Sequence, residues 1–226
     1  MSNVLIIGFT TEGNTDVRFL EHIIRRTFED IAFECESLIE IHSVQHIPIK
    51  KNSFAIDCFN AAQKAYNAGF STYCIHSDAD NESDKPTLSN RIEKAFQMIL
   101  NELSSEICKN LVPIVPIQMT EAWMLADIEL LKEEIGTDKN TVELGLHRSP
   151  ESIADPKYII TEAIRIAFSS ETKRKRSKID ISELYSPIGQ KLCLNKLSYL
   201  TSYKKFREEV RKSFVRLNFL QPKVSQ

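Results

Sequence analysis

The sequence predicts an α/β protein with a mostly parallel sheet flanked by helices and a helical C-terminal extension. Apolar runs of strand length alternate with segments of helical apolar spacing up to about Pro150. The first run is apolar without interruption, as is typical of a strand buried on both faces of a parallel sheet. Beyond Pro150 the pattern becomes helical. We therefore expect one α/β domain over residues 1–150 and a basic helical extension over 151–226 packed on it.

The N-terminal part of the chain predicts a strand, a tight turn, a helix and a second strand. Residues 4–9 (VLIIGF) form the first strand. Helical spacing follows over 17–31, with Thr15 as the expected N-cap. Residues 38–49 alternate between apolar and polar side chains, which predicts a second, less buried strand. The apolar positions of the helix are Val17, Leu20, Ile24, Phe28 and Ile31.

The middle of the chain predicts a helix over residues 56–66 that Gly69 can end. Its expected apolar face consists of Ile56, Phe59, Ala62 and Tyr66. Residues 72–76 (TYCIH) then predict a strand rich in β-forming residues. The acidic segment 77–82 (SDADNE) follows directly, so this strand delivers carboxylates to one edge of the sheet.

A further helix and strand are expected before the pattern changes. Apolar residues recur at helical spacing over 88–107, and 111–119 forms another apolar segment. Pro113 and Pro116 predict that this strand is irregular or lies at an edge of the sheet, because proline cannot donate to a strand ladder. Strands that alternate with helices indicate βαβ units and a mostly parallel sheet.

Composition argues against several classes of protein. No apolar run approaches the roughly 18 residues that are needed to cross a bilayer, so we expect no membrane association. The N-terminus shows no basic segment or cleavage site of a signal peptide, which predicts a cytoplasmic protein. The five cysteines are scattered and form no Cys-x-x-Cys pair. This pattern argues against a disulfide framework and against a zinc site.

The net charge of −2 hides a strong asymmetry. Residues 1–156 contain 13 Lys and Arg against 25 Asp and Glu, whereas residues 157–226 contain 16 against 6. An acidic body can hold divalent cations, and a basic extension can bind a polyanion such as nucleic acid. The alternative is that the two parts only complement each other electrostatically.

Acidic residues follow three of the predicted strands. Glu12 follows the first strand, Asp78 and Asp80 follow the strand at 72–76, and Glu121 follows the segment at 111–119. Parallel strands deliver their following loops to the same edge of the sheet, so these carboxylates should converge. Their repulsion favours a hard divalent cation with oxygen ligands. We therefore expect a Mg²⁺ site, in which Mn²⁺ can substitute.

The arrangement of these motifs resembles the Toprim fold of topoisomerases, primases and OLD-type nucleases. A strand that ends in Glu12-Gly13 and a later strand that ends in Asp78-Ala79-Asp80 carry this resemblance. A small Toprim-like family, encoded beside an ABC-type ATPase in anti-phage defence systems, is more similar still. The segments that resemble it are EGNTD (12–16), HSDAD (76–80), EAWMLAD (121–127) and YKKFREEVRKSF (203–214).

The resemblance implies a Mg²⁺-dependent endonuclease that acts on DNA or RNA. It implies that Glu12, Asp78 and Asp80 hold the metal, and Glu121 is the expected additional ligand. His76 is a candidate general base, with simple hydrogen bonding as the alternative role. At position 16 this sequence has Asp, whereas the family it resembles is expected to have Glu more often. Asp127 is expected to be structural and Trp123 to lie in the core.

The resemblance also implies partners. The chain would be a toxic effector that an ABC-type ATPase restrains or releases. The alternative is a non-catalytic subunit that docks on that ATPase and uses its carboxylates for structure or regulation. Homodimerisation is left open, because no heptad pattern or exposed apolar stripe indicates it.

The C-terminal basic residues are candidates for contact with nucleic-acid phosphates. The last helix should have one apolar face, through Phe206, Val210 and Phe214, which docks on the sheet domain and leaves the basic face outward. A solvated charged face is the alternative. The candidate residues are Lys173, Arg174, Lys175, Arg176, Lys178, Lys204, Lys205 and Arg211.

Two other phosphate-related patterns fit poorly. Residues 8–15 match the phosphate-loop pattern except that Asn14 replaces its lysine, and Glu12 adds repulsion within the loop. The pair Asp78 and Asp80 also resembles the haloacid-dehalogenase phosphatases, but Glu82 stands where these have Thr or Val. A small-molecule phosphatase would also leave the basic surface without a purpose.

Overall fold

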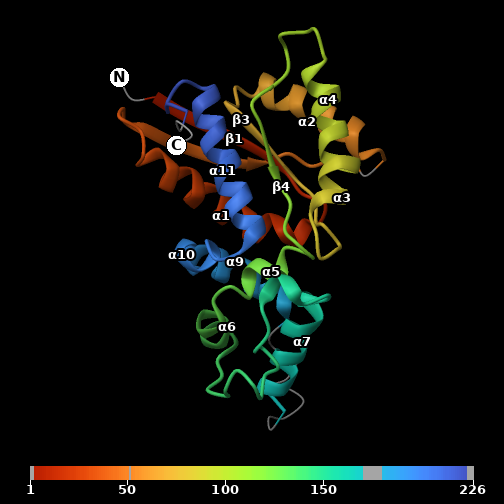
Figure 1. Ribbon diagram of the computed structural model, residues 1–226, viewed down its shortest axis with the longest axis vertical. Helices are drawn as coiled ribbons and strands as arrows, with labels where there is room; N and C mark the ends of the chain where they lie inside the picture. Colours follow the sequence, from red (N-terminus) through yellow and green to blue (C-terminus); the bar gives the residue numbers. More distant parts are fainter. Residues whose placement is uncertain (1–2, 51, 170–179, 223–226) are drawn as a thin grey trace.

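The computed structural model describes residues 3–50, 52–169 and 180–222 and contains a four-stranded parallel sheet (Figure 1). The strand order is β2-β1-β3-β4, which places β4 at one edge. The predicted α/β class and mostly parallel sheet are thereby confirmed. The strands are β1 (Asn3–Thr10), β2 (Ile39–His46), β3 (Thr72–His76) and β4 (Leu111–Ile114).

Helices cover both faces of the sheet and form a lobe beyond its carboxyl edge (Figure 1). The first group is α1 (Asn14–Ala32), α2 (Phe54–Asn67), α3 (Lys85–Thr87), the π-helical turn η1 (Leu88–Ile92) and α4 (Glu93–Leu100). The second group is α5 (Glu121–Met124), α6 (Ile128–Ile135), the 3₁₀ turn η2 (Pro150–Ser152), α7 (Pro156–Ala167), α9 (Ile181–Lys191), α10 (Leu194–Leu197) and α11 (Thr201–Arg216).

Two apolar clusters lie on opposite faces of the sheet. Leu5, Ile7 and Phe9 of β1 belong to the cluster that α1 and α11 cover. Tyr73 and Ile75 of β3 belong to the cluster that α2 and α4 cover. This alternation along buried strands is why the first strand is apolar at nearly every position.

The C-terminal helix α11 is part of the main core. Its apolar face packs on α1 and β4, and the Phe214 ring lies 5.8 Å from the Phe28 ring between centroids. The Glu151 carboxylate caps this helix, because it accepts from the backbone N–H groups of Thr201 and Ser202 at 2.9 and 2.8 Å. A single hydrophobic cluster therefore joins residues on both sides of Pro150.

The helix α9 packs closely on α1 and carries residues to the carboxyl edge. Gly189 makes this approach feasible, since a Cβ there would lie 2.9 Å from the Phe19 carbonyl oxygen. The Arg26 guanidinium donates to the Gly189 carbonyl at 3.1 Å across the same contact. Part of the C-terminal extension is thus fixed beside the first helix.

Several predicted boundaries were wrong. The N-cap of α1 is Gly13 and not Thr15, and the helix begins at Asn14. The helix expected over 88–107 ends at Leu100, and Leu103 is 98% exposed. The Glu102 and Ser104 side chains accept hydrogen bonds from the N–H groups two residues later, and these local bonds compete with a further helical turn.

The predicted face of α2 was also partly wrong. Ile56 and Tyr66 are exposed, and the residues that α2 buries are mostly small. Small side chains let the helix lie close to the sheet, so bulky residues are left at its flanks. Gly69, with φ of 74°, follows the end of α2 as predicted. The buried residues of α2 are Asp57, Cys58, Ala61, Ala62 and Ala65.

Within the part of the chain that the structure describes, no helix is both long and apolar enough to span a membrane.

Candidate functional site

An acidic cleft of about 560 Å³ lies at the carboxyl edge of the sheet, between β1 and β3. The strand order reverses at this point, because β2 and β3 lie on opposite sides of β1. Such switch points are the usual ligand sites of open parallel sheets. The structure brings all four predicted acidic residues into this cleft. Its charged lining consists of Glu12, Asp16, Asp57, Asp78, Asp80, Glu121, Arg91 and Lys157.

The loop that carries Asp78 and Asp80 is held by the segment that follows β4. Backbone N–H groups of Ala79 and Asp80 donate to the carbonyls of Pro116 and Gln118 at 3.0 and 2.8 Å. Asp80 has a φ of 49°, in the left-handed region that Asp tolerates better than most residues. The predicted strand over 111–119 is thus a short edge strand with an irregular continuation, as its two prolines indicate.

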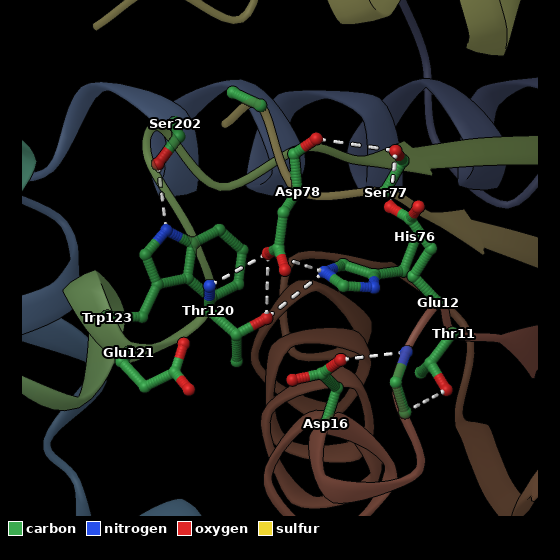
Figure 2. Close-up of polar contacts among 12 residues, drawn as sticks. Thr11, Glu12, Asp16, His76, Ser77, Asp78, Thr120, Glu121, Trp123 and Ser202 are labelled. Carbon is green, nitrogen blue, oxygen red and sulfur yellow. Dashed lines mark hydrogen bonds and ion pairs between the residues drawn. The ribbon is translucent and has the colours of Figure 1, made fainter. Parts of the chain in front are cut away.

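Asp78 is fixed by three hydrogen bonds to its Oδ1 (Figure 2). The Thr120 N–H and Oγ1 donate at 2.8 and 3.1 Å, and His76 Nε2 lies at 3.2 Å. Burial raises the pKa of Asp78, but His76 and the Thr120 hydrogen bonds outweigh it and lower the pKa below the ordinary value. Asp78 therefore stays ionised, with Oδ1 held by the protein.

His76 lies behind Asp78 and has no exposed surface. It does not line the cleft and is hydrogen-bonded to Asp78 and Thr120, which was the alternative role, so its role as a general base stays a prediction. Burial lowers the pKa of His76, but the carboxylates of Asp78, Asp16 and Glu12 raise it overall. Its Nδ1 is buried without a hydrogen-bond partner among the described residues. The direct hydrogen bond from His76 to a carboxylate of the cleft is the one to Asp78.

Glu12 lies on the turn between β1 and α1, and both of its oxygens are engaged. Arg91 Nη2 donates to Oε1 at 2.7 Å, and the buried Ser77 hydroxyl donates to Oε2 at 2.9 Å. The Arg91 guanidinium also lies over the Phe54 ring, 4.6 Å from its centroid. Arg91 therefore supplies the counter-charge that Glu12 has in this structure.

Asp16 in the first turn of α1 is the most perturbed carboxyl group of the cleft. Its Oδ2 accepts from the Gly13 N–H at 3.1 Å, and the residue is buried (Figure 2). Burial, together with the charges of Asp78 and Glu121, raises the pKa of Asp16 to about 6. Asp16 thus adds a carboxyl group from the first turn of α1 to the acidic lining of the cleft.

This pKa gives a prediction about stability without divalent cations. Because the folded pKa lies above 3.8, the favourable contribution of neutral Asp16 is full below about pH 4 and is lost as pH rises through about 6. The Asp16→Asn variant keeps an acceptor for Gly13. It should be more stable than wild type by on the order of 2–3 kcal/mol near pH 8, and equally stable near pH 4.

Urea unfolding in chelator at both pH values measures this difference. Asp138→Asn, at an exposed position, is the matched control and should change neither value. A stability difference for Asp16→Asn that is the same at both pH values would contradict the assignment.

Glu121 begins α5 and is almost fully buried. The Tyr185 hydroxyl of α9 donates to its Oε1, and Lys157 Nζ lies 4.0 Å from the same oxygen. Burial and the Glu121 carboxylate raise the pKa of Tyr185 well above its ordinary value. Lys157 stands at the start of α7, so both α7 and α9 contribute to this side of the cleft.

Two neighbours of Glu121 are structural, as predicted. Trp123 has no exposed surface, and its Nε1 donates to the Ser202 hydroxyl at 2.8 Å. Asp127 caps α6 by accepting from the Leu130 N–H at 3.2 Å, and Lys196 pairs with the same oxygen at 2.6 Å.

The donor set of the cleft fits a hard divalent cation in its chemistry. Among the described residues, the lining offers six carboxylates against two basic side chains, and it contains no cysteine or histidine. Carboxylate oxygens are the ligands of Mg²⁺ and Mn²⁺. The carboxylates are not assembled in advance, since no group of three or more His, Cys, Asp or Glu residues in the described ranges has metal-binding geometry. Asp80 is exposed, whereas Glu12 is held by Arg91.

Of the predicted nucleic-acid contacts, Lys204, Lys205 and Arg211 lie in the part of the chain that the structure describes. Residues 173–178 lie outside the described residues. Lys205 pairs with Asp84 at 2.6 Å, and Arg211 pairs with Glu34, just beyond the end of α1 that is remote from the cleft. Two of the three remaining candidates are therefore already neutralised within the chain, and Lys204 is exposed.

Several residues of the site were not predicted from the sequence. Asp16 had a signal, because it stands four residues after Glu12, in the first turn of the helix that follows the strand end. Lys157 and Arg91 had none, since isolated basic residues in helices are usually solvated. Thr120 and Tyr185 are recognised only through their contacts with residues 42 and 64 positions away.

Comparison with known proteins finds one family. The protein-family model described as "Domain of unknown function (DUF4276)" matches residues 11–187 of this chain. This range contains every charged residue of the cleft and also Tyr185, and it ends before α11. Neither the curated proteins nor the solved structures contain a match.

Proposed function

The chain belongs to the DUF4276 family, and from its acidic cleft we propose that it is a divalent-cation-dependent phosphodiesterase that acts on nucleic acid. The observation that carries the proposal is that Glu12, from the turn after β1, and Asp78 and Asp80, from the loop after β3, line one cleft at the switch point of a parallel sheet. Such a gathering of like charges is costly without a counter-cation. Arg91 and Lys157 offset only part of it.

Glu12, Asp78 and Asp80 would hold the cation, with Glu121 as a further ligand. A bound cation supplies Lewis-acid stabilisation of the negative charge that develops on a phosphoryl group. The protein's contribution is orientation. Thr120 and His76 fix one oxygen of Asp78, and the backbone of 116–118 fixes the loop that presents Asp80. Hydrogen bonds that orient ligating side chains in this way usually strengthen the binding of the metal ion.

Nucleic acid is the proposed substrate class because the C-terminal part of the chain carries an excess of positive charge. Residues 157–226 contain 16 Lys and Arg against 6 Asp and Glu. The first residue of this basic part, Lys157, lies in the cleft itself. A polyanion that enters the cleft would meet Arg91 and Lys157 there, among six carboxylates whose charge a bound cation would offset.

One observation favours the alternative of a non-catalytic subunit that docks on an ABC-type ATPase. Glu12 and Asp78 are already satisfied by Arg91, Ser77 and Thr120, as structural carboxylates would be. The two proposals differ in whether the isolated chain binds a divalent cation and cleaves a phosphodiester.

The test uses the purified full chain with fluorescent single-stranded and double-stranded DNA and RNA. Cleavage should require Mg²⁺ or Mn²⁺ and should be lost when a chelator is added. Calorimetry with Mn²⁺ supplies a readout that does not depend on substrate choice. A chain that binds no Mn²⁺ and cleaves none of the substrates would contradict the enzyme and favour the docking subunit.

A further inference from the structure

Arg91 lies on the π-helical turn η1, in the middle of an otherwise helical segment. The Glu93 N–H bonds to the Leu88 carbonyl, five residues earlier, as a π turn requires. Such insertions are often found at functional sites, because the extra residue changes the direction of the side chains. Here the turn sends Arg91 to the cleft, where it meets the turn after β1.

The contacts of Arg91 leave much of its binding capacity open. Nη2 donates to Glu12 at 2.7 Å, and the guanidinium lies on the Phe54 ring. A guanidinium carries five N–H donors in a planar fork that matches phosphate oxygens. The side chains of Arg91 and Glu12 are each 34% exposed, so this pair is within reach of solvent and ligand.

A divalent cation and Arg91 compete for Glu12. A cation that is bound by Glu12, Asp78 and Asp80 would lie within a few ångströms of the guanidinium, and the two positive charges repel each other. The Phe54 ring offers a second attachment that does not depend on Glu12. Arg91 would therefore remain at the cleft after its pair with Glu12 is broken.

We infer that Arg91 binds the substrate's phosphodiester, and that its pair with Glu12 is the cation-free state of the same site. Cation binding releases the guanidinium, so cation and substrate phosphate bind in a coupled manner. This inference rests on the proposed function. Lys157, the other described basic residue of the lining, lies beside Glu121 and not beside Glu12, so this role is assigned to Arg91.

The first arm of the test measures the cation alone. Calorimetry with Mn²⁺ should show that Arg91→Gln binds the ion about tenfold more tightly than wild type, because the competing charge is removed. Arg91→Lys keeps the charge and should stay within about twofold of wild type. Arg165→Gln, an exposed position on α7, controls for net charge and should also match wild type.

The second arm measures the phosphodiester. Labelled oligonucleotides of DNA and RNA with phosphorothioate linkages are titrated in the presence of Mn²⁺, and binding is followed by fluorescence anisotropy. Arg91→Gln should bind at least about tenfold more weakly, with Arg91→Lys between it and wild type.

The outcomes separate the two claims. If wild type binds Mn²⁺ but Arg91→Gln binds it no more tightly, or binds oligonucleotide as wild type does, the inference about Arg91 is overturned while the proposed function stands. If wild type binds no Mn²⁺, the proposed function itself fails. Circular dichroism of each variant establishes that the fold is retained.

Discussion

The Asp80→Asn substitution is expected to abolish phosphodiester hydrolysis and to leave the fold intact. Asp80 is exposed in the cleft, and the loop that presents it is fixed through its backbone. Loss of one carboxylate ligand removes much of the cation's stabilisation of the transition state, which amounts to roughly a thousandfold or more in rate. Initial rates on labelled oligonucleotides, measured with saturating Mn²⁺, provide the readout.

Stability in chelator should not fall in this variant. Burial and the charges of Asp78 and Glu12 raise the pKa of Asp80, so its ionised form is disfavoured in the folded protein. Asn is the better replacement than Ala because Asp80 has a φ of 49°, which Asn tolerates. Activity within a few-fold of wild type would contradict a role in metal binding, and loss of the fold would show that Asp80 is structural.

Among the substitutions proposed for this protein, Trp123→Ala should cause the largest loss of stability. Trp123 has no exposed surface and packs against Tyr203 and Phe206 at ring-centroid distances of 5.4 and 5.9 Å. It thereby joins α5, which carries Glu121, to α11. Removal of a buried aromatic side chain should lower the free energy of unfolding by about 3–5 kcal/mol. Urea unfolding, followed by circular dichroism, measures the change.

Tyr199→Ala provides the matched control, because this aromatic residue near the start of α11 is 82% exposed. Its effect should be within about 0.5 kcal/mol. Equal losses for the two variants would contradict the claim that Trp123 connects the site to the C-terminal helix.

The sheet and the meeting of the acidic residues were predictable from the sequence. An uninterrupted apolar run at 4–9 indicates a central parallel strand, and the carboxylates stand directly after the strand ends. The two prolines after Leu111 correctly predicted an edge strand. These features follow from local spacing and from the rules for parallel sheets, which need no knowledge of distant contacts.

The counter-charges and hydrogen-bond partners of the site were not predictable in this way. Helical spacing over Leu88 and Ile92 treats Arg91 as a surface residue, because nothing in the spacing reveals a π turn. Thr120 and Tyr185 reach their carboxylates only through the tertiary fold. His76 precedes the acidic loop in sequence, yet its side chain lies behind that loop in the core.

The ion-pair partners of the basic residues on the C-terminal helix were not predictable from the sequence either. The sequence reveals that Lys205 and Arg211 share a helix, but their partners Asp84 and Glu34 come from the other part of the chain. A charge count therefore predicts attraction between the parts as readily as attraction to nucleic acid. Only the positions of the acidic partners in the folded chain distinguish attraction between its two parts from attraction to nucleic acid.

The most direct test of the proposed metal site is a crystal structure of the full chain soaked with Mn²⁺, with the ion located from its anomalous scattering. One or more peaks are expected in the cleft, coordinated by Glu12, Asp78 and Asp80, with Arg91 moved away from Glu12. An empty cleft at saturating Mn²⁺, with the Arg91 to Glu12 pair intact, would contradict the proposed metal site.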